Sequence, residues 1–242
     1  RRIWATVLKE KYGVEDKRSL LLRFHTQTSG ASLTWQQPMN NIIRTTIEAL
    51  AGVLGGTQSL HTNSYDEAWA LPTEDAVKIA LRTQQIIAEE TGITSTADPL
   101  GGSYYIEWLT DKMEEQAYQY FDKIDSMGGV VNAIKNGYLQ KEIAETAYKT
   151  QLKIKKDKDI IVGVNKYNEK EDKPIDTLKV DLKAQEIQIN RLKKIKDERD
   201  NNKVKESLER LRKSYSNENE NCMYATLEAV NSYATLQEIM DI

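Results

Sequence analysis

The sequence predicts an α/β fold built from strand–loop–helix units, and two similar stretches carry that prediction. A strand-like run ends in the polar cluster at 25–30, and a second run ends in a closely similar cluster at 61–64. Each run is followed by apolar residues at helical spacing, over 40–54 and over 73–91. In a parallel α/β barrel the carboxyl ends of the strands carry the polar site, and the outer helices provide packing. We therefore expect the C-terminal part of a (β/α)8 TIM barrel with a polar rim.

The first two units, within residues 1–136, each have recognisable helix boundaries. The helix over 40–54 begins after a proline and ends at paired glycines, and its apolar stripe, which includes Ile43 and Ile47, is expected to face inward. The helix over 73–91 begins with a threonine cap and an acidic first turn, and it ends at a glycine. Both helices are expected to pack on the outside of the strands.

A third unit and a different region follow. The third unit is expected to have a turn, a short β-prone run at 104–108 and then a helix up to residue 128. Beyond residue 136 charged stretches become dense, so we place a domain boundary there and assign 137–242 to a mostly helical linker region. Its expected elements are a helix at 139–155, a β-prone string at 160–167, a charged helical region at 183–213 interrupted near 200–202, and a helix that begins at the capping box of Thr235 and Glu238.

Composition narrows the class of protein. The net charge of −3, from 34 basic and 37 acidic residues, gives no electrostatic footprint for nucleic acid. No apolar run approaches the roughly 20 residues that span a bilayer, and no signal peptide is visible. The single cysteine, Cys222, is expected to be a small semi-buried apolar residue, which fits a reducing compartment. We expect a cytoplasmic protein that binds neither nucleic acid nor membrane.

The start of the chain indicates a longer protein. The sequence opens at Arg1 without methionine, inside what is expected to be a helix that ends at Gly13. Three units are too few to close an eight-stranded barrel. We therefore expect the N-terminal half of the barrel to precede Arg1.

Five strings of residues are more specific than any periodicity, and together they resemble one family in order across the whole chain. They resemble the large, catalytic subunit of methylmalonyl-CoA mutase. That resemblance implies an adenosylcobalamin-dependent mutase that rearranges the carbon skeleton of an acyl-CoA by radical chemistry, with the cofactor carrying the difficult step. The strings are Arg23–Gly30, Asn40–Ala49, Gly56–Ala68, Asp98–Tyr104 and Val162–Tyr167.

The resemblance implies hydrogen-bonding roles for four residues of the two strand ends. Glu67 and Asn63 match residues that bind the adenosyl ribose, for which a carboxylate is a natural acceptor. Gln27 matches a glutamine between the substrate and the corrin, so it is expected to contact both. His25 lies beside Gln27 and is expected to bind the substrate.

The resemblance also implies packing roles for small and apolar residues. Gly30, Ala68 and Leu71 match positions that pack on the corrin or the adenosine, where small groups permit close approach. Many family members carry a tryptophan after the glycine, whereas this chain has Ala31. The packing against the corrin is therefore expected to differ in detail.

Each assignment has an alternative that needs no ligand. From the pattern alone, His25 and His61 could be buried histidines satisfied by backbone carbonyls, and for His61 this is the preferred interpretation. Asp66 and Glu67 could be the solvated approach to a helix, because acids are favoured near a helix N-terminus. A metal-dependent hydrolase that uses His25, His61 and Glu67 is a third and weaker reading.

Two features of the family are absent from the sequence. The residues that bind CoA and the substrate carboxylate are expected upstream of Arg1, so no catalytic residue is assigned. The Asp-x-His-x-x-Gly signature, whose histidine ligates cobalt, is also absent, so no metal ligand is assigned. The resemblance therefore implies a separate cobalamin-binding small subunit and an isolated chain without activity.

Substrate identity is less specific than family identity. Methylmalonyl-CoA, interconverted with succinyl-CoA, is the leading substrate. Related mutases act on isobutyryl-, ethylmalonyl- or 2-hydroxyisobutyryl-CoA. An alternative from another class of function is that this chain is a non-catalytic fragment that serves as a scaffold for a cobalamin-binding partner.

Overall fold

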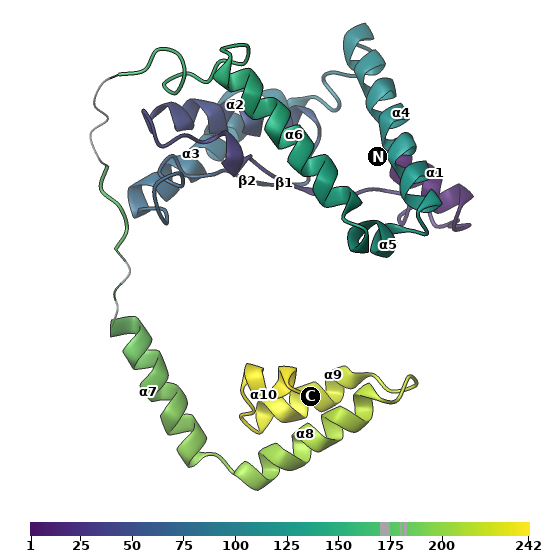
Figure 1. Ribbon diagram of the computed structural model, residues 1–242, viewed down its shortest axis with the longest axis vertical. Coiled ribbons are helices and arrows are strands. Elements are labelled where there is room, and N and C mark those ends of the chain that lie inside the picture. Colours follow the sequence, from purple (N-terminus) through teal and green to yellow (C-terminus); the bar gives the residue numbers. More distant parts are fainter. Residues whose placement is uncertain (170–174, 180, 182) are drawn as a thin grey trace. The chain divides into compact units, whose positions relative to one another are not determined.

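The computed structural model describes residues 1–169, 175–179, 181 and 183–242, and these form two compact units, Arg1–Leu178 and Lys179–Ile242 (Figure 1). The predicted boundary after residue 136 remains a prediction about where the barrel ends. Unit 1 contains α1 (Arg2–Glu10), β1 (His25–Gln27), α2 (Asn40–Leu54), β2 (Ser59–His61), α3 (Glu74–Glu90), α4 (Tyr104–Ser126), α5 (Val130–Lys135) and α6 (Tyr138–Lys155). Unit 2 contains α7 (Lys183–Glu198), α8 (Asn201–Tyr215), α9 (Cys222–Asn231) and α10 (Leu236–Met240).

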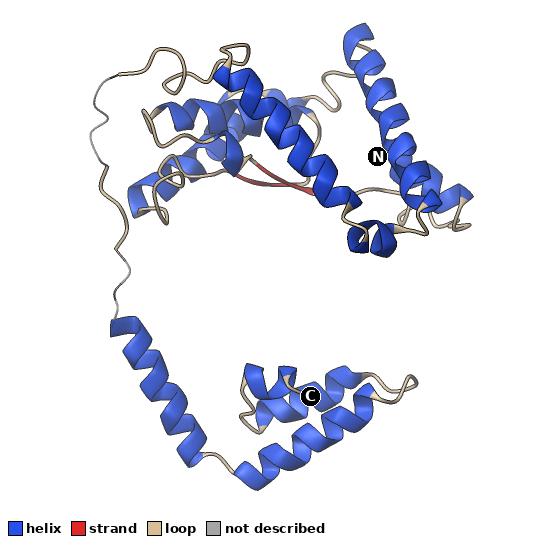
Figure 2. Ribbon diagram, viewed as in Figure 1, coloured by secondary structure: helices blue, strands red, loops and turns tan. Residues whose placement is uncertain are grey.

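The two predicted strands form a parallel pair connected through α2. His25 lies opposite Ser59 and Gln27 lies opposite His61, so the carboxyl ends of both strands meet at one edge. The structure is accordingly mostly helical with a small parallel sheet (Figure 2), which confirms the α/β class. The closure of eight strands into a barrel remains a prediction.

Helix α2 approaches one face of this sheet closely. A Cβ added at Gly52 would lie 3.0 Å from the Cγ2 atom of Thr26, so a larger residue there would push the helix away. The buried residues of α2 are Asn41, Thr45 and Ala49, spaced by four along one face. The boundaries of α2 agree with the prediction, but the buried face differs, because Ile43 and Ile47 are 60% and 63% exposed.

Helix α3 begins as its sequence predicts. Thr73 is the N-cap, and its side chain accepts a hydrogen bond from the backbone N–H of Ala76. Glu74 and Asp75 follow in the first turn, where their negative charge interacts favourably with the helix dipole and so stabilises the helix. The helix ends at Glu90, just before the left-handed Gly92.

The prediction of a β-prone run at 104–108 is wrong, because these residues form the first turns of α4 (Tyr104–Ser126). The side chain of Glu107 accepts a hydrogen bond from the backbone N–H of Gly102 at 3.0 Å, which stabilises the start of the helix. Tyr105 and Trp108 stack along the helix at 6.0 Å between ring centroids. The β preference of aromatic residues depends on a neighbouring strand, and here helical neighbours prevail.

The β-prone string at 160–167 is also not a strand. It forms a tight turn with one isolated bridge between Val162 and Lys166. The side chain of Asn165 accepts a hydrogen bond from the backbone N–H of Ile161 at 2.7 Å, and so closes the turn locally.

Unit 2 has its own core between α8 and α9. Leu211, Ala225 and Ala229 are fully buried there, and Cys222 packs against them, as expected of a semi-buried apolar cysteine. The interruption predicted near 200–202 is confirmed, since α7 ends at Glu198 and α8 begins at Asn201.

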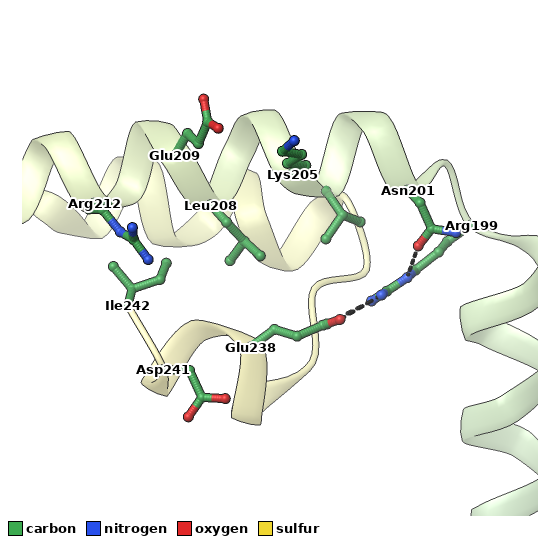
Figure 3. A pocket seen from close by; sticks show the side chains of 10 residues that line it. Arg199, Asn201, Lys205, Leu208, Glu209, Arg212, Glu238, Asp241 and Ile242 are labelled. Carbon is green, nitrogen blue, oxygen red and sulfur yellow. Dashed lines mark hydrogen bonds and ion pairs between the residues drawn. The ribbon is translucent and has the colours of Figure 1, made fainter.

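An ion pair ties the start of α8 to α10 (Figure 3). The guanidinium of Arg199, only 7% exposed, donates to both carboxylate oxygens of Glu238, at 2.7 and 2.6 Å. Glu238 also completes the predicted capping box, because it accepts from the backbone N–H of Thr235 at 2.7 Å. The hydrogen bond from Arg199 lowers the pKa of Glu238 to about 2.

Replacing Glu238 by Gln is expected to lower the free energy of unfolding of unit 2 at pH 7 by about 1–2 kcal/mol, because Arg199 loses a forked ionic partner that is partly solvent-screened. A depressed pKa stabilises the folded state above the unfolded value of 4.5, and this contribution is lost as the pH falls toward about 2. Urea unfolding at pH 7 and pH 2.5 should therefore show a smaller difference between wild type and variant at the lower pH. Glu220→Gln, whose ion pair with Arg210 is long at 4.0 Å, is the control. An equal effect of both substitutions would contradict this role.

Candidate functional site

Hydrogen bonds join the two strand ends to each other. The hydroxyl of Thr28 donates to Oδ1 of Asn63 at 2.5 Å, and the backbone N–H of Asn63 donates to the same hydroxyl at 2.9 Å. The backbone N–H of Thr28 donates to the carbonyl of His61 at 3.1 Å. Thr28 and Asn63 are both only 4% exposed. The loops that follow β1 and β2 therefore form one rim.

Glu67 lies on this rim and is held by its own loop. One carboxylate oxygen accepts from Nδ2 of Asn63 at 2.6 Å, and the other accepts from the backbone N–H of Ser64 at 2.7 Å. Each oxygen of a carboxylate can accept about two hydrogen bonds, so Glu67 retains capacity for a further donor. The side chain is half-buried and can be reached from solvent.

One face of the two strands carries exposed polar side chains. His25 and Gln27 on β1 and Ser59 and His61 on β2 are all exposed, whereas the intervening residues are half-buried. Nδ1 of His25 lies 2.6 Å from the hydroxyl of Ser59, within hydrogen-bond distance. The alternative in which both histidines are buried is therefore wrong, and His61 belongs to the same face as Gln27.

Small and apolar residues border the polar groups. Gly30, Ala68 and Leu71 are all exposed on the two loops. A Cβ added at Gly30 would meet Nδ2 of Asn63 at 3.7 Å, an ordinary contact distance, so packing within the chain does not require a glycine there. The structure thus leaves room at Gly30 for close approach of a ligand.

Asp66 is not the solvated carboxylate of the alternative reading. It is 1% exposed, and its Oδ2 atom accepts from the backbone N–H and the hydroxyl of Thr73, at 2.8 and 2.9 Å. It therefore holds the loop after β2 against the N-terminus of α3. Burial, and next the carboxylates of Asp66 and Asp75, raise the pKa of the nearby Tyr65 phenol, which keeps that phenol neutral.

A buried amide below the rim connects both loops, and sequence reasoning missed it. Asn41 is 0% exposed; its Nδ2 donates to the carbonyls of Thr34 and Tyr65, at 2.8 and 2.9 Å. Its Oδ1 accepts from the backbone N–H of Thr34 at 3.0 Å and from Arg44 at 2.7 Å. Two signals in the sequence point to it: Asn41 and Arg44 are one helical turn apart, and both lie in the string Asn40–Ala49 that resembles the family.

The structure gives no support to a metal-dependent hydrolase. Among the residues that the structure describes, no three histidine, cysteine, aspartate or glutamate side chains are grouped so that they could hold a metal ion. Within the same described residues, no helix is long and apolar enough to cross a bilayer.

The fold and the rim define an α/β domain that presents neutral polar groups and one carboxylate, flanked by small residues, at the ends of parallel strands. Comparison with known proteins then identifies the family. The family model described as methylmalonyl-CoA mutase matches residues 1–242, the whole chain. The chain therefore belongs to the methylmalonyl-CoA mutase family, as the resemblance of its motifs implied.

Individual relatives show the same relationship over the full chain. The chain is 45% identical to the 2-hydroxyisobutanoyl-CoA mutase large subunit of Aquincola tertiaricarbonis and covers 43% of that protein. It is 46% identical to a probable mitochondrial methylmalonyl-CoA mutase of Caenorhabditis elegans and covers 32% of it. It is 43% identical to the methylmalonyl-CoA mutase large subunit of Porphyromonas gingivalis, with 34% covered. The chain thus spans less than half the length of these relatives.

Proposed function

We propose that this chain forms part of an adenosylcobalamin-dependent mutase that rearranges the carbon skeleton of an acyl-CoA thioester, as part of a (β/α)8 barrel. The observation that carries the proposal is the convergence of Gln27, Asn63 and Glu67 at one edge of two parallel strands. Family membership over the whole chain supports the reaction class.

The residues of the rim fit the proposed cofactor. When bound, adenosylcobalamin supplies the radical chemistry. Glu67 offers free acceptor capacity and Asn63 one remaining N–H donor, which together match adjacent ribose hydroxyls. Gly30 and the exposed Leu71 leave an open, partly apolar surface on which a flat ring can pack.

The exposed strand face suits the substrate side of the site. Gln27 can donate and accept hydrogen bonds without changing charge, and His25 is oriented by its contact with Ser59. An amide such as that of Gln27 positions a thioester without offering a strong acid or base for side reactions. His25 and Gln27 are therefore proposed to bind the acyl-CoA.

The leading substrate is methylmalonyl-CoA, interconverted with succinyl-CoA. A specific observation also favours 2-hydroxyisobutyryl-CoA, since one of the relatives most similar to this chain is named as a mutase of that thioester. Two of the relatives are named large subunits, which supports a cobalamin-binding small subunit as the partner.

The proposal is tested by combining the full-length protein with a cobalamin-binding subunit and adenosylcobalamin, then assaying isomerisation of each acyl-CoA. Turnover is expected with methylmalonyl- or 2-hydroxyisobutyryl-CoA and not when the cofactor is omitted. The isolated 242-residue chain is expected to be inactive, because it spans 43% or less of the compared relatives. Turnover by that chain alone would refute its predicted inactivity. If the complete mixture isomerised no acyl-CoA, the proposed function would be refuted.

A further inference from the structure

The segment 161–167, here called the strap, is a self-supporting turn. The side chain of Asn165 donates to the carbonyls of Ile154 and Asp159, at 3.0 and 2.9 Å, and accepts from the N–H of Ile161. The backbone N–H of Gly163 donates to the carbonyl of Lys166 at 2.8 Å. The shape of the strap is therefore set by its own hydrogen bonds and by the end of α6.

Two carbonyls of the strap accept hydrogen bonds from the region that follows β1. Nη2 of Arg44 donates to the carbonyl of Val162 at 2.8 Å. Nε2 of Gln37 donates to the carbonyl of Tyr167 at 2.9 Å. The strap is thus anchored near both ends, by residues far from it in the sequence.

Arg44 connects the strap to both loops of the rim. Its Nη1 atom donates to the hydroxyl of Thr34 at 2.8 Å and to Oδ1 of Asn41 at 2.7 Å. Asn41 in turn donates to the carbonyl of Tyr65, in the loop that carries Asn63 and Glu67. One guanidinium therefore links the strap, directly or through Asn41, to the loops on which the rim residues lie.

Backbone strain at the contact supports a role beyond simple coverage. Gln37 and Tyr167 are non-glycine residues with φ of 45° and 56°, and the hydrogen bond described above joins them. A left-handed conformation is unfavourable for non-glycine residues, so it persists where the surroundings over-determine it. The strained pair thus indicates that the fit between strap and loop is specified closely.

We propose that the strap positions the cofactor-binding rim, with Arg44 and Gln37 as positioning residues that act through the loops. This inference rests on the proposed function, because the ligand of the rim is taken to be adenosylcobalamin. A disturbed strap is expected to weaken cofactor binding in protein that is still folded.

Two glycine substitutions separate positioning from backbone strain. Gly163 has a φ of +82°, and a Cβ there would lie 3.1 Å from both Cδ and Oε1 of Gln37. Gly137 has a φ of +70°, and a Cβ there would meet nothing within 4 Å. Gly163→Ala and Gly137→Ala therefore impose similar strain, but only the first displaces the anchor of the strap.

The first measurement is the Kd for adenosylcobalamin of the full-length protein with its cobalamin-binding subunit, alongside the Tm of each variant. Gly163→Ala is expected to raise the Kd about 3- to 10-fold, whereas Gly137→Ala lowers the Tm comparably and leaves the Kd unchanged. Arg44→Lys, which keeps the positive charge but loses the forked guanidinium, is expected to raise the Kd about 10-fold. Arg82→Lys, at an exposed arginine that contacts Gln85 on α3, is its control. A Kd that no strap variant raises above its control would overturn the proposal.

Hydrogen–deuterium exchange of the same variants decides the question without cofactor. Amides of residues 28–39 and 62–69 are expected to exchange faster in Gly163→Ala and Arg44→Lys than in the two controls. Unchanged exchange in both loops would overturn the positioning role by itself. If instead wild-type protein bound no adenosylcobalamin while exchange rose as expected, the proposed function would fail and the strap would remain a positioning element of the rim.

Discussion

Replacing Asn41 by Leu is expected to destabilise unit 1 by about 3–5 kcal/mol. Leucine has a similar volume, but it leaves the backbone N–H and carbonyl of Thr34, the carbonyl of Tyr65 and one donor of Arg44 without their partner. Each buried polar group left unsatisfied costs about 1–3 kcal/mol, and partial relaxation of the loops keeps the sum below the maximum.

Urea unfolding of the chain measures this effect directly. Asn136→Leu, at an exposed asparagine in the same unit, is the control and should change the free energy of unfolding by less than about 0.5 kcal/mol. If Asn41→Leu unfolded with a free energy within about 1 kcal/mol of wild type, the buried amide would not hold the two loops together.

Replacing Glu67 by Ala is expected to lower the affinity of the full-length protein for adenosylcobalamin about 10- to 100-fold. The substitution removes the proposed ribose acceptor, and it also frees Nδ2 of Asn63 and the backbone N–H of Ser64. Both effects act on the same group of hydrogen-bonding residues, so the expected loss of affinity is larger than the loss from removing one exposed hydrogen bond.

Spectroscopic titration of adenosylcobalamin, together with the Tm of each protein, checks this result. Glu74→Ala removes an exposed carboxylate in the first turn of α3, next to the same loop, and should leave the affinity unchanged. Glu67→Gln keeps an acceptor of the same size and should lie between wild type and the alanine variant. Equal affinity of wild type and Glu67→Ala would exclude Glu67 from the cofactor site.

The parts of the fold that could be predicted from sequence are those with local causes. The helices over 40–54 and 74–90 follow from apolar periodicity and from caps, and the parallel pairing of β1 and β2 follows from their repeated strand–loop–helix context. The capping box of Thr235 and Glu238 was similarly visible, because its spacing is fixed by backbone geometry.

The parts that could not be predicted depend on partners distant in the sequence. On α2 the exposed Ile43 marked the expected inner face, whereas the buried face carries Asn41, whose partners in two loops no helical pattern reveals. Residues 104–108 have strand propensity but no neighbouring strand in the sheet, which contains only β1 and β2 among the described residues. The string Val162–Tyr167 in the strap resembles a family motif, but no spacing in the sequence indicates its anchoring by Arg44.

The hydrogen bonds between Thr28 and Asn63 have a consequence for the thermodynamics of binding. They close within the chain and are buried, so the rim is preorganised and the entropy of ordering these loops is lost on folding rather than on ligand capture. The amide of Asn63 is also fixed in orientation, because its oxygen accepts from Thr28 and its Nδ2 donates to Glu67, which leaves one N–H of Nδ2 without a described partner. Beside the carboxylate of Glu67, this arrangement supports the proposed recognition of a vicinal diol, whose two hydroxyls can donate to the carboxylate and accept from an N–H.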